Sequence, residues 1–185
     1  MIPLLVAATA FDPVMTVAEV TTSKGKKYRV ETCFRDPRHL HTQFIYPDRR
    51  GRFDIDGDSA TTTENQDAPR PASDSEKAFA FGHQFHAIHV NFAKLDPNRR
   101  KASAIPGANA LRPGWTGAMP YGGTVTSLRS AKGRVEGYWF DVPDTTPIML
   151  RFSDWRDGGR IPYRLQLNHA GTVYDYRFTK IEFRC

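Results

Sequence analysis

The sequence predicts a mainly β (α+β) fold: a curved antiparallel half-barrel sheet of about eight or more strands with one or two helices packed on its concave face. Apolar and polar residues alternate along most of the chain, which is the period of a strand with one buried face. The spacing changes to that of an amphipathic helix only near the middle of the chain. Turn signals rich in Gly, Asp, Asn and Pro separate the alternating segments, so sequential strands are expected to form hairpins.

The first ten residues, 1–10, are apolar and end in small residues. This pattern favours a weak secretory signal segment, with a misplaced start codon or a buried first segment as the alternatives. A signal would place the protein in the periplasm or cell envelope. Residues 11–185 are then expected to form a single half-barrel domain, since a chain of this length can bury one core.

A short covering helix is predicted directly after this segment. Asp12 is a good N-cap residue, and Pro13 is tolerated at the first helical position. Val14 and Val17 then share one helical face, and Gly25 is a natural stop.

Two groups of strands follow from the alternation. The predicted strands are residues 27–34, 42–46, 52–56, 60–63, 125–130, 135–142, 148–152, 161–167 and 174–183. In the last of them the apolar phase slips, and a bulge near Thr179 and Lys180 would return the side chains to one face. Because strands twist, such a meander curls, and it either closes into a barrel or stays a half-barrel plugged by helices.

The predicted central helix has apolar residues at i, i+4, i+7, i+11 and i+14. These residues are Phe81, Phe85, Ile88, Phe92 and Leu95. Ser73 or Ser75 can cap the helix, which ends before Pro97. The next segment, residues 96–123, is rich in Pro and Gly and weakly patterned, so it is expected to be a lid over a cavity or to hold an unassigned short element.

The formal charge is +6 and the isoelectric point is about 9.5. The basic residues are dispersed singly along different segments, which favours solvated strand faces and argues against a nucleic-acid partner. Peripheral membrane contact is compatible with this charge. No stretch of the sequence is long and apolar enough to span a bilayer.

Two cysteines, Cys33 and Cys185, stand far apart in the chain. They suit one long-range disulfide in an oxidising compartment, or they are two unrelated thiols. They do not suit zinc, which needs more ligands at close spacing.

Three histidines, His83, His86 and His89, recur every third residue on the predicted helix. They spread around the surface of the helix. The histidines therefore either pack in the core or line a pocket, and a metal site is a remote alternative. The acidic segment 54–58 resembles the start of a calcium loop, but its spacing fails and a hairpin turn explains it better. No catalytic motif is present, so the sequence predicts neither an enzyme nor a cofactor.

The closing hairpins resemble a known superfamily. Residues 153–167 carry Trp155, a glycine turn, Pro162 and Leu165, and residues 171–183 end in Thr-Lys-Ile-Glu-Phe. Together with residues 133–140 this pattern resembles the lipoprotein-carrier-like half-barrels (LolA-, LolB- and LppX-like). The resemblance covers the last third of the chain. It implies a half-barrel that binds acyl chains or other apolar ligands in the cell envelope, and it transfers no catalytic residue.

The sequence therefore predicts a non-enzymatic envelope protein that binds or carries a lipid or other apolar small molecule between sheet and helix. The alternatives are a structural or interaction module whose interior is filled, and a metal-binding protein or hydrolase built on the histidine helix. The residues predicted to bind the ligand are Phe81, Phe85, His86, Ile88, His89, Phe92, Trp115, Met119, Tyr138, Phe140 and Phe152.

Overall fold

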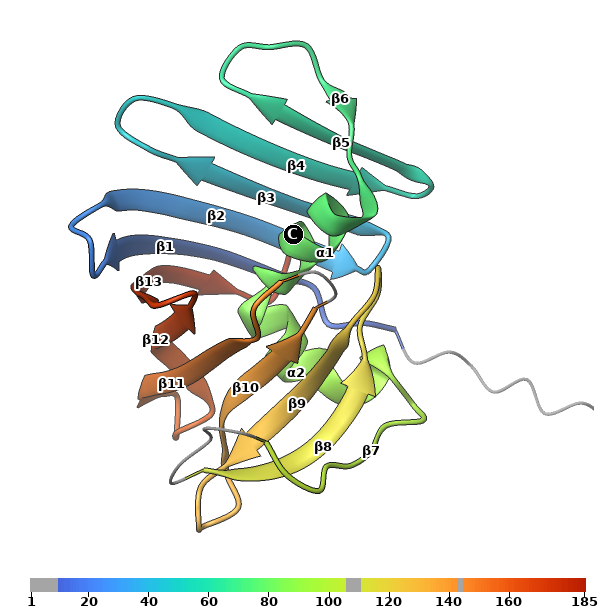
Figure 1. The fold of residues 1–185 in the computed structure, drawn as a ribbon, viewed down its shortest axis with the longest axis vertical. Coiled ribbons are helices and arrows are strands. Elements are labelled where there is room, and N and C mark those ends of the chain that lie inside the picture. Colours follow the sequence, from blue (N-terminus) through green and yellow to red (C-terminus); the bar gives the residue numbers. More distant parts are fainter. Residues whose placement is uncertain (1–9, 106–110, 143–144) are drawn as a thin grey trace, which may run out of the picture.

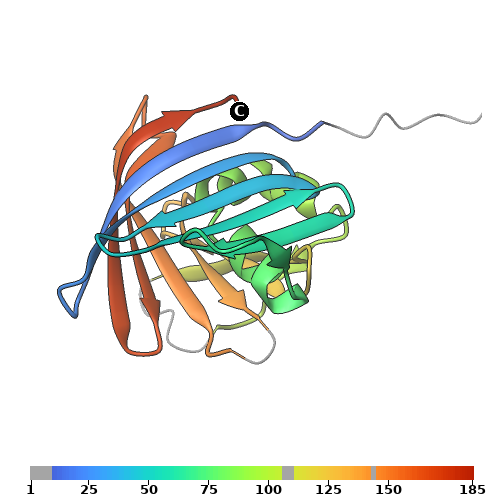
Figure 2. The same cartoon turned by 90° about the horizontal axis from the view of Figure 1, so that it is seen from above.

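A computed structural model describes residues 10–105, 111–142 and 145–185. Within these residues, thirteen strands form one antiparallel sheet that curves without closing, and two helices lie inside its curve (Figures 1 and 2). This confirms the predicted half-barrel class. The strands are β1 (Val14–Thr22), β2 (Lys27–Asp36), β3 (His39–Ile45), β4 (Arg50–Asp56), β5 (Ser59–Glu64), β6 (Arg70–Pro71), β7 (Arg100–Lys101), β8 (Arg112–Ala118), β9 (Thr124–Arg129), β10 (Val135–Asp141), β11 (Ile148–Arg156), β12 (Ile161–His169) and β13 (Thr172–Glu182). The helices are α1 (Asp74–Gly82) and α2 (Phe85–Leu95).

The topology combines hairpins with one long connection through the two helices. The strand order is β6-β5-β4-β3-β2-β1-β13-β12-β11-β10-β9-β8-β7, so the chain winds outward from β1 to one sheet edge. The helices then connect the two edges across the concave face, and the second half winds back until β13 pairs with β1 (Figure 1). This path places α1 beside β3 and β4, and α2 beside β1.

The predicted N-terminal helix is wrong, because residues 14–22 form the central strand β1. Its residues are buried alternately, from Val14 and Thr16 to Thr22, which is the period of a strand. Pairing with β2 on one side and β13 on the other overrides the weak helical pattern. Asp12 does not cap a helix: its main chain exchanges two hydrogen bonds with the Asn91 amide of α2, at 2.8 and 2.9 Å.

The predicted single helix is broken into two. Ser73 caps α1 through a reciprocal capping box with Glu76, as one of the two predicted caps. The break follows Gly82, where the buried Gln84 side chain donates to the Thr42 hydroxyl at 2.8 Å and to the His41 carbonyl at 3.0 Å. These bonds tie the break between the helices to β3 and turn the chain into α2.

The segment predicted as a weakly patterned loop contains β7 and β8 at the sheet edge. Its strand pattern is hidden because Gly114 sits at a register shift between β8 and β9, where an added Cβ would lie 2.6 Å from the Ser127 hydroxyl.

The predicted bulge on the last strand, β13, is confirmed. Val17 pairs with Lys180 and Ala18 with Phe178, so Thr179 is the extra residue.

Cys33 on β2 and Cys185 after β13 form a disulfide, with Cα atoms 5.8 Å apart. It links residues 152 positions apart and holds the C-terminus beside the central strands.

The acidic segment 54–58 forms the turn of the β4–β5 hairpin, with Gly57 at a φ of +63°. Of the predicted signal segment, residues 1–9 lie outside the described residues. No described helix is long and apolar enough to cross a membrane.

Candidate ligand-binding cavity

An apolar cavity of about 210 Å³ lies between α1 and the strands at one end of the concave face. Strands from both halves of the sheet contribute to it, because the curvature brings them around the same helix. Its lining residues are Tyr28, Phe44, Tyr46, Ser75, Ala78, Phe79, Gly82, His83, Phe85, Phe140, Val142, Thr145, Ile148, Leu167, His169, Tyr174 and Tyr176.

The space exists because α1 turns a face of mainly small residues toward the sheet. Ser75, Ala78, Phe79 and Gly82 follow the i, i+3, i+4, i+7 spacing of one helical face, and all four line the cavity. Three of them are too small to reach the opposite strands. Phe79 is the exception, and it is 49% exposed, which is unusual for a large apolar side chain.

A wall of aromatic rings separates this cavity from a second one. Phe44, Tyr46 and Phe79 line both cavities. The Phe79 ring lies 5.6 Å from Phe44, 5.8 Å from Phe53 and 4.4 Å from the His83 imidazole, centroid to centroid. The Phe79 ring therefore lies at the border of the two spaces.

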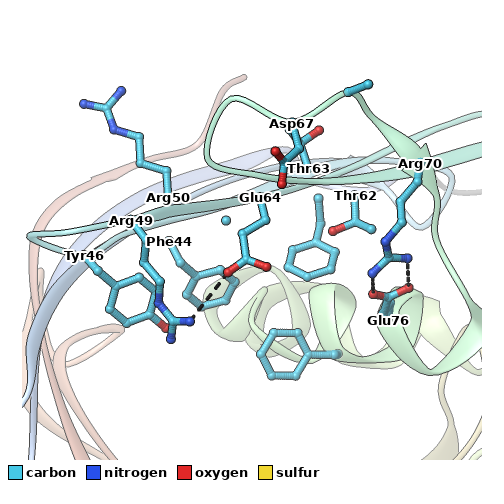
Figure 3. Close-up of a pocket in the computed structure, with 14 residues that line it drawn as sticks. Phe44, Tyr46, Arg49, Arg50, Thr62, Thr63, Glu64, Asp67, Arg70 and Glu76 are labelled. Atoms are coloured by element: carbon cyan, nitrogen blue, oxygen red, sulfur yellow. Dashed lines mark hydrogen bonds and ion pairs between the residues drawn. The ribbon is translucent and has the colours of Figure 1, made fainter.

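The second cavity has a volume of about 340 Å³ and a mixed lining, in which charged side chains stand beside aromatic rings (Figure 3). Arg70 and Glu76 form a two-pronged ion pair across one side, at 2.6 and 3.1 Å, and Arg49 faces Glu64 at 3.6 Å on the other. The Arg70 guanidinium holds the pKa of Glu76 down to about 2, and the Ser73 amide and hydroxyl add to this effect. The charged walls of this cavity therefore neutralise each other.

Two of the eleven predicted ligand-binding residues, Phe85 and Phe140, line the apolar cavity. Six others are buried in the packed interior and do not line it: Phe81, His86, Ile88, Met119, Tyr138 and Phe152. His89 and Phe92 are half-buried on α2 and contact the Tyr138 ring. Trp115 is half-buried on β8, next to the edge strand β7, with the Arg99 guanidinium 5.7 Å from its ring. The structure thus brings most of the predicted residues together as a filled core beside the cavity.

The three histidines point to three different partners. His83 donates from Nδ1 to the Phe79 carbonyl at 2.9 Å, and His86 donates from Nε2 to the Pro162 carbonyl at 2.7 Å. His89 Nδ1 shares a 3.1 Å hydrogen bond with the Tyr138 hydroxyl. Within the described residues no group of three His, Cys, Asp or Glu side chains is placed to hold a metal ion. The geometry gives the remote metal-site hypothesis no support.

Sequence reasoning missed most of the cavity lining. Tyr28, Phe44, Tyr46 and Tyr174 were recognisable only as apolar positions of their strands, because their convergence depends on strand order and curvature. Phe79 precedes the apolar stripe that marked the central helix. The small residues of α1 were the available signal, since a helix face of Ser, Ala and Gly cannot fill a core.

The curved sheet with its inner helices has a counterpart among solved structures. It is similar to the crystal structure of a LolA superfamily protein from Nitrosomonas europaea, with a TM-score of 0.60 over 94% of this chain and 87% of that one. The two sequences are 12% identical, so the similarity concerns the fold. No protein-family model and no curated protein sequence matches this chain. The LolA-like fold expected from the closing hairpins is confirmed.

Proposed function

We propose that this protein is a non-enzymatic carrier that binds an acyl chain, or the apolar part of another ligand, in the cavity beside α1. The observation that supports this most directly is the cavity itself: an apolar space between helix and curved sheet. Apolar ligands gain free energy from such a site because each buried methylene is worth about 0.8 kcal/mol.

The size of the cavity limits what it holds. Sites for drug-sized ligands have volumes of about 300–1,000 Å³, and a cavity of about 150 Å³ is enough for benzene. At about 210 Å³ the cavity beside α1 accommodates one apolar segment of a ligand. A longer chain requires the Phe79 ring to move, which would add the neighbouring space.

The disulfide supports a location outside the cytoplasm. Structural disulfides form and persist in oxidising compartments such as the periplasm. The bond between Cys33 and Cys185 closes a loop of most of the chain, so its formation favours the folded half-barrel. We place the protein in the periplasm or cell envelope, and assign residues 11–185 to a single domain.

The second candidate function, a structural or interaction module without a ligand, is favoured by the filled end of the concave face. Tyr138 and His86 are each 1% exposed, and rings from α2 and the sheet pack around them. If the 210 Å³ cavity behaves like this filled end, no apolar ligand will bind.

A cavity-filling substitution distinguishes the two functions. Ile148 is the first residue of β11 and lines the cavity, so Ile148→Trp is expected to occupy the space. The wild-type protein should bind the uncharged apolar probe N-phenyl-1-naphthylamine with increased fluorescence, and Ile148→Trp should weaken that binding by about tenfold or more. Mass spectrometry of the purified protein gives a second readout, a co-purifying lipid.

Ile161→Trp is the matched control. Ile161 is the equivalent first residue of β12, is also half-buried, and lies at the other end of the antiparallel pair, opposite Arg156. Its substitution should leave probe binding unchanged, and circular dichroism should show both variants folded. Absence of probe binding by the wild-type protein, or equal binding by Ile148→Trp, would contradict the carrier function.

A further inference from the structure

A basic groove adjoins the apolar cavity. It has a volume of about 760 Å³ and runs along the β1–β2 turn, the β3–β4 turn and the start of β13. Figure 1 shows the two turns at the same end of the sheet, on the left. Three tyrosines, Tyr28, Tyr46 and Tyr174, line both the groove and the apolar cavity. The boundary between a polar and an apolar space therefore consists of side chains that are themselves amphipathic.

The groove carries an excess of positive charge. Its lining includes four cationic side chains, Lys24, Lys26, Lys27 and Arg49, against one acidic side chain, Asp48. The three lysines are exposed and have no ion-pair partner among the described residues. Elsewhere on the sheet, several cationic side chains face a carboxylate, as Arg164 faces Asp175. The three lysines are consequently available to an anion from outside the chain.

The second cavity, shown in Figure 3, provides the internal comparison. Its three arginines, Arg49, Arg50 and Arg70, are matched by three carboxylates, and two of these arginines are engaged in ion pairs. An anion entering that cavity would meet Glu64 and Glu76 as well as arginine. The two spaces share a border with the apolar cavity, but only the basic groove is electrostatically suited to a negatively charged group.

The tyrosines at the border can donate hydrogen bonds to such a group. The ordinary pKa of a tyrosine, about 10, already leaves its hydroxyl protonated at neutral pH. Burial raises the pKa of Tyr28 and of Tyr46 further, so both hydroxyls are hydrogen-bond donors. The Tyr28 and Tyr46 rings lie 4.7 Å apart, and the Arg49 guanidinium sits 4.6 Å from the Tyr46 ring centroid. This stack holds the Arg49 guanidinium, which also faces Glu64, at the point where the cavity meets the groove.

We propose that the ligand is an anionic amphiphile, whose apolar chain enters the cavity beside α1 while its carboxylate or phosphate head group lies in the basic groove. The inference rests on the proposed carrier function and adds the charge of the head group to it. A carboxylate and a phosphate share the chemistry that the groove recognises, so the experiment includes both.

The test compares three ligands with the same oleoyl chain: oleate, 1-oleoyl-glycerol-3-phosphate and uncharged monoolein, each below its aggregation concentration and measured by displacement of N-phenyl-1-naphthylamine. Both anionic ligands should bind about tenfold more tightly than monoolein at low salt, and the difference should shrink as salt screens the lysines. The stronger of the two anionic ligands identifies the head-group type.

Neutralising the groove should remove the preference. The triple variant Lys24→Gln, Lys26→Gln, Lys27→Gln is expected to weaken oleate and the phosphate ligand by about tenfold and to leave monoolein unchanged, since exposed ion pairs each contribute modestly. The matched control is Arg100→Gln, Lys101→Gln, Lys132→Gln. It removes the same charge from exposed positions that do not line the groove or the cavity, and should have no effect.

Three results would overturn the inference. Equal affinity for anionic and uncharged ligands would remove the head-group assignment and leave the carrier function standing. Equal weakening by the control triple would mean that net charge, and not the groove, attracts the anion. Failure of all three ligands and of the probe to bind would overturn the carrier function together with this inference.

Discussion

The two ends of the concave face are built differently, although two consecutive helices, α1 and α2, cover them. At the α2 end, helix and sheet fill the space between them with large side chains: the His86 imidazole packs 4.3 Å from the Phe178 ring, and Phe92 lies 5.5 Å from Tyr138. At the α1 end the helix presents Ala78 and Gly82, and the space remains open. Large residues on a helix therefore mark where the half-barrel is held together, and small ones mark where space remains for the proposed ligand.

The strongest test of this contrast is a truncation at the filled end. Ile88 on α2 is 1% exposed, so Ile88→Ala should lower the free energy of unfolding by about 4 kcal/mol, from lost burial and from the void left behind. Denaturant titration monitored by circular dichroism measures the change. A loss below about 1 kcal/mol would show that the α2 end relaxes around the void and is not tightly packed.

The fold was predictable because its signals are local. The alternation of Lys27–Phe34 and the slip at Thr179 each lie within one strand and its turn, and both were interpreted correctly. β1 was not, because the residues 14–22 fit a short helical stripe as well as a strand, and only pairing with β2 and β13 decides between them. The break at Gln84 also depends on a partner distant in sequence, the Thr42 hydroxyl.

The site was less predictable than the fold. The aromatic stripe from Phe81 to Phe92 indicated the helix that faces the sheet, but such a stripe identifies the filled part of an interior. The cavity depends on the absence of large side chains at Ala78 and Gly82 and on the curvature of the sheet. The basic groove forms when Lys24 and Arg49, from separate hairpins, meet at one end of the sheet. The spacing of these residues along the sequence does not reveal that they lie close together in the fold.

Acid should destabilise the filled end more than the open end. Burial lowers the pKa of His86 from 6.5 to about 4, and its Nδ1 has no hydrogen-bond partner among the described residues to accept the additional proton. The native state therefore favours the neutral imidazole. Its stabilising effect is complete above pH 6.5 and is lost as the pH falls toward 4, amounting to about 3 kcal/mol for this residue.

Unfolding free energies measured between pH 7.5 and 4.5 test the direction of this pH dependence. In the wild-type protein stability should fall with pH, and His86→Gln should remove the contribution of one proton from that slope. His83→Gln is the control from the open end: burial lowers the pKa of His83 in the same direction, but that half-buried side chain keeps contact with solvent, so its substitution should change the slope less. A larger effect of His83→Gln would reverse the assignment of the two ends.

The smallest change in stability is expected at Phe79, and it should be accompanied by a change in ligand preference. The side chain is 49% exposed, so Phe79→Ala should cost about 1 kcal/mol or less, in contrast to Ile88→Ala. The same truncation removes the ring that separates the cavities of about 210 and 340 Å³, so longer acyl chains should gain affinity relative to shorter ones. Probe displacement by fatty acids of increasing length measures this shift, and denaturant titration measures the cost. A stability loss as large as that of Ile88→Ala would show that Phe79 belongs to the packed core, and unchanged chain-length preference would show that the aromatic wall does not limit the ligand.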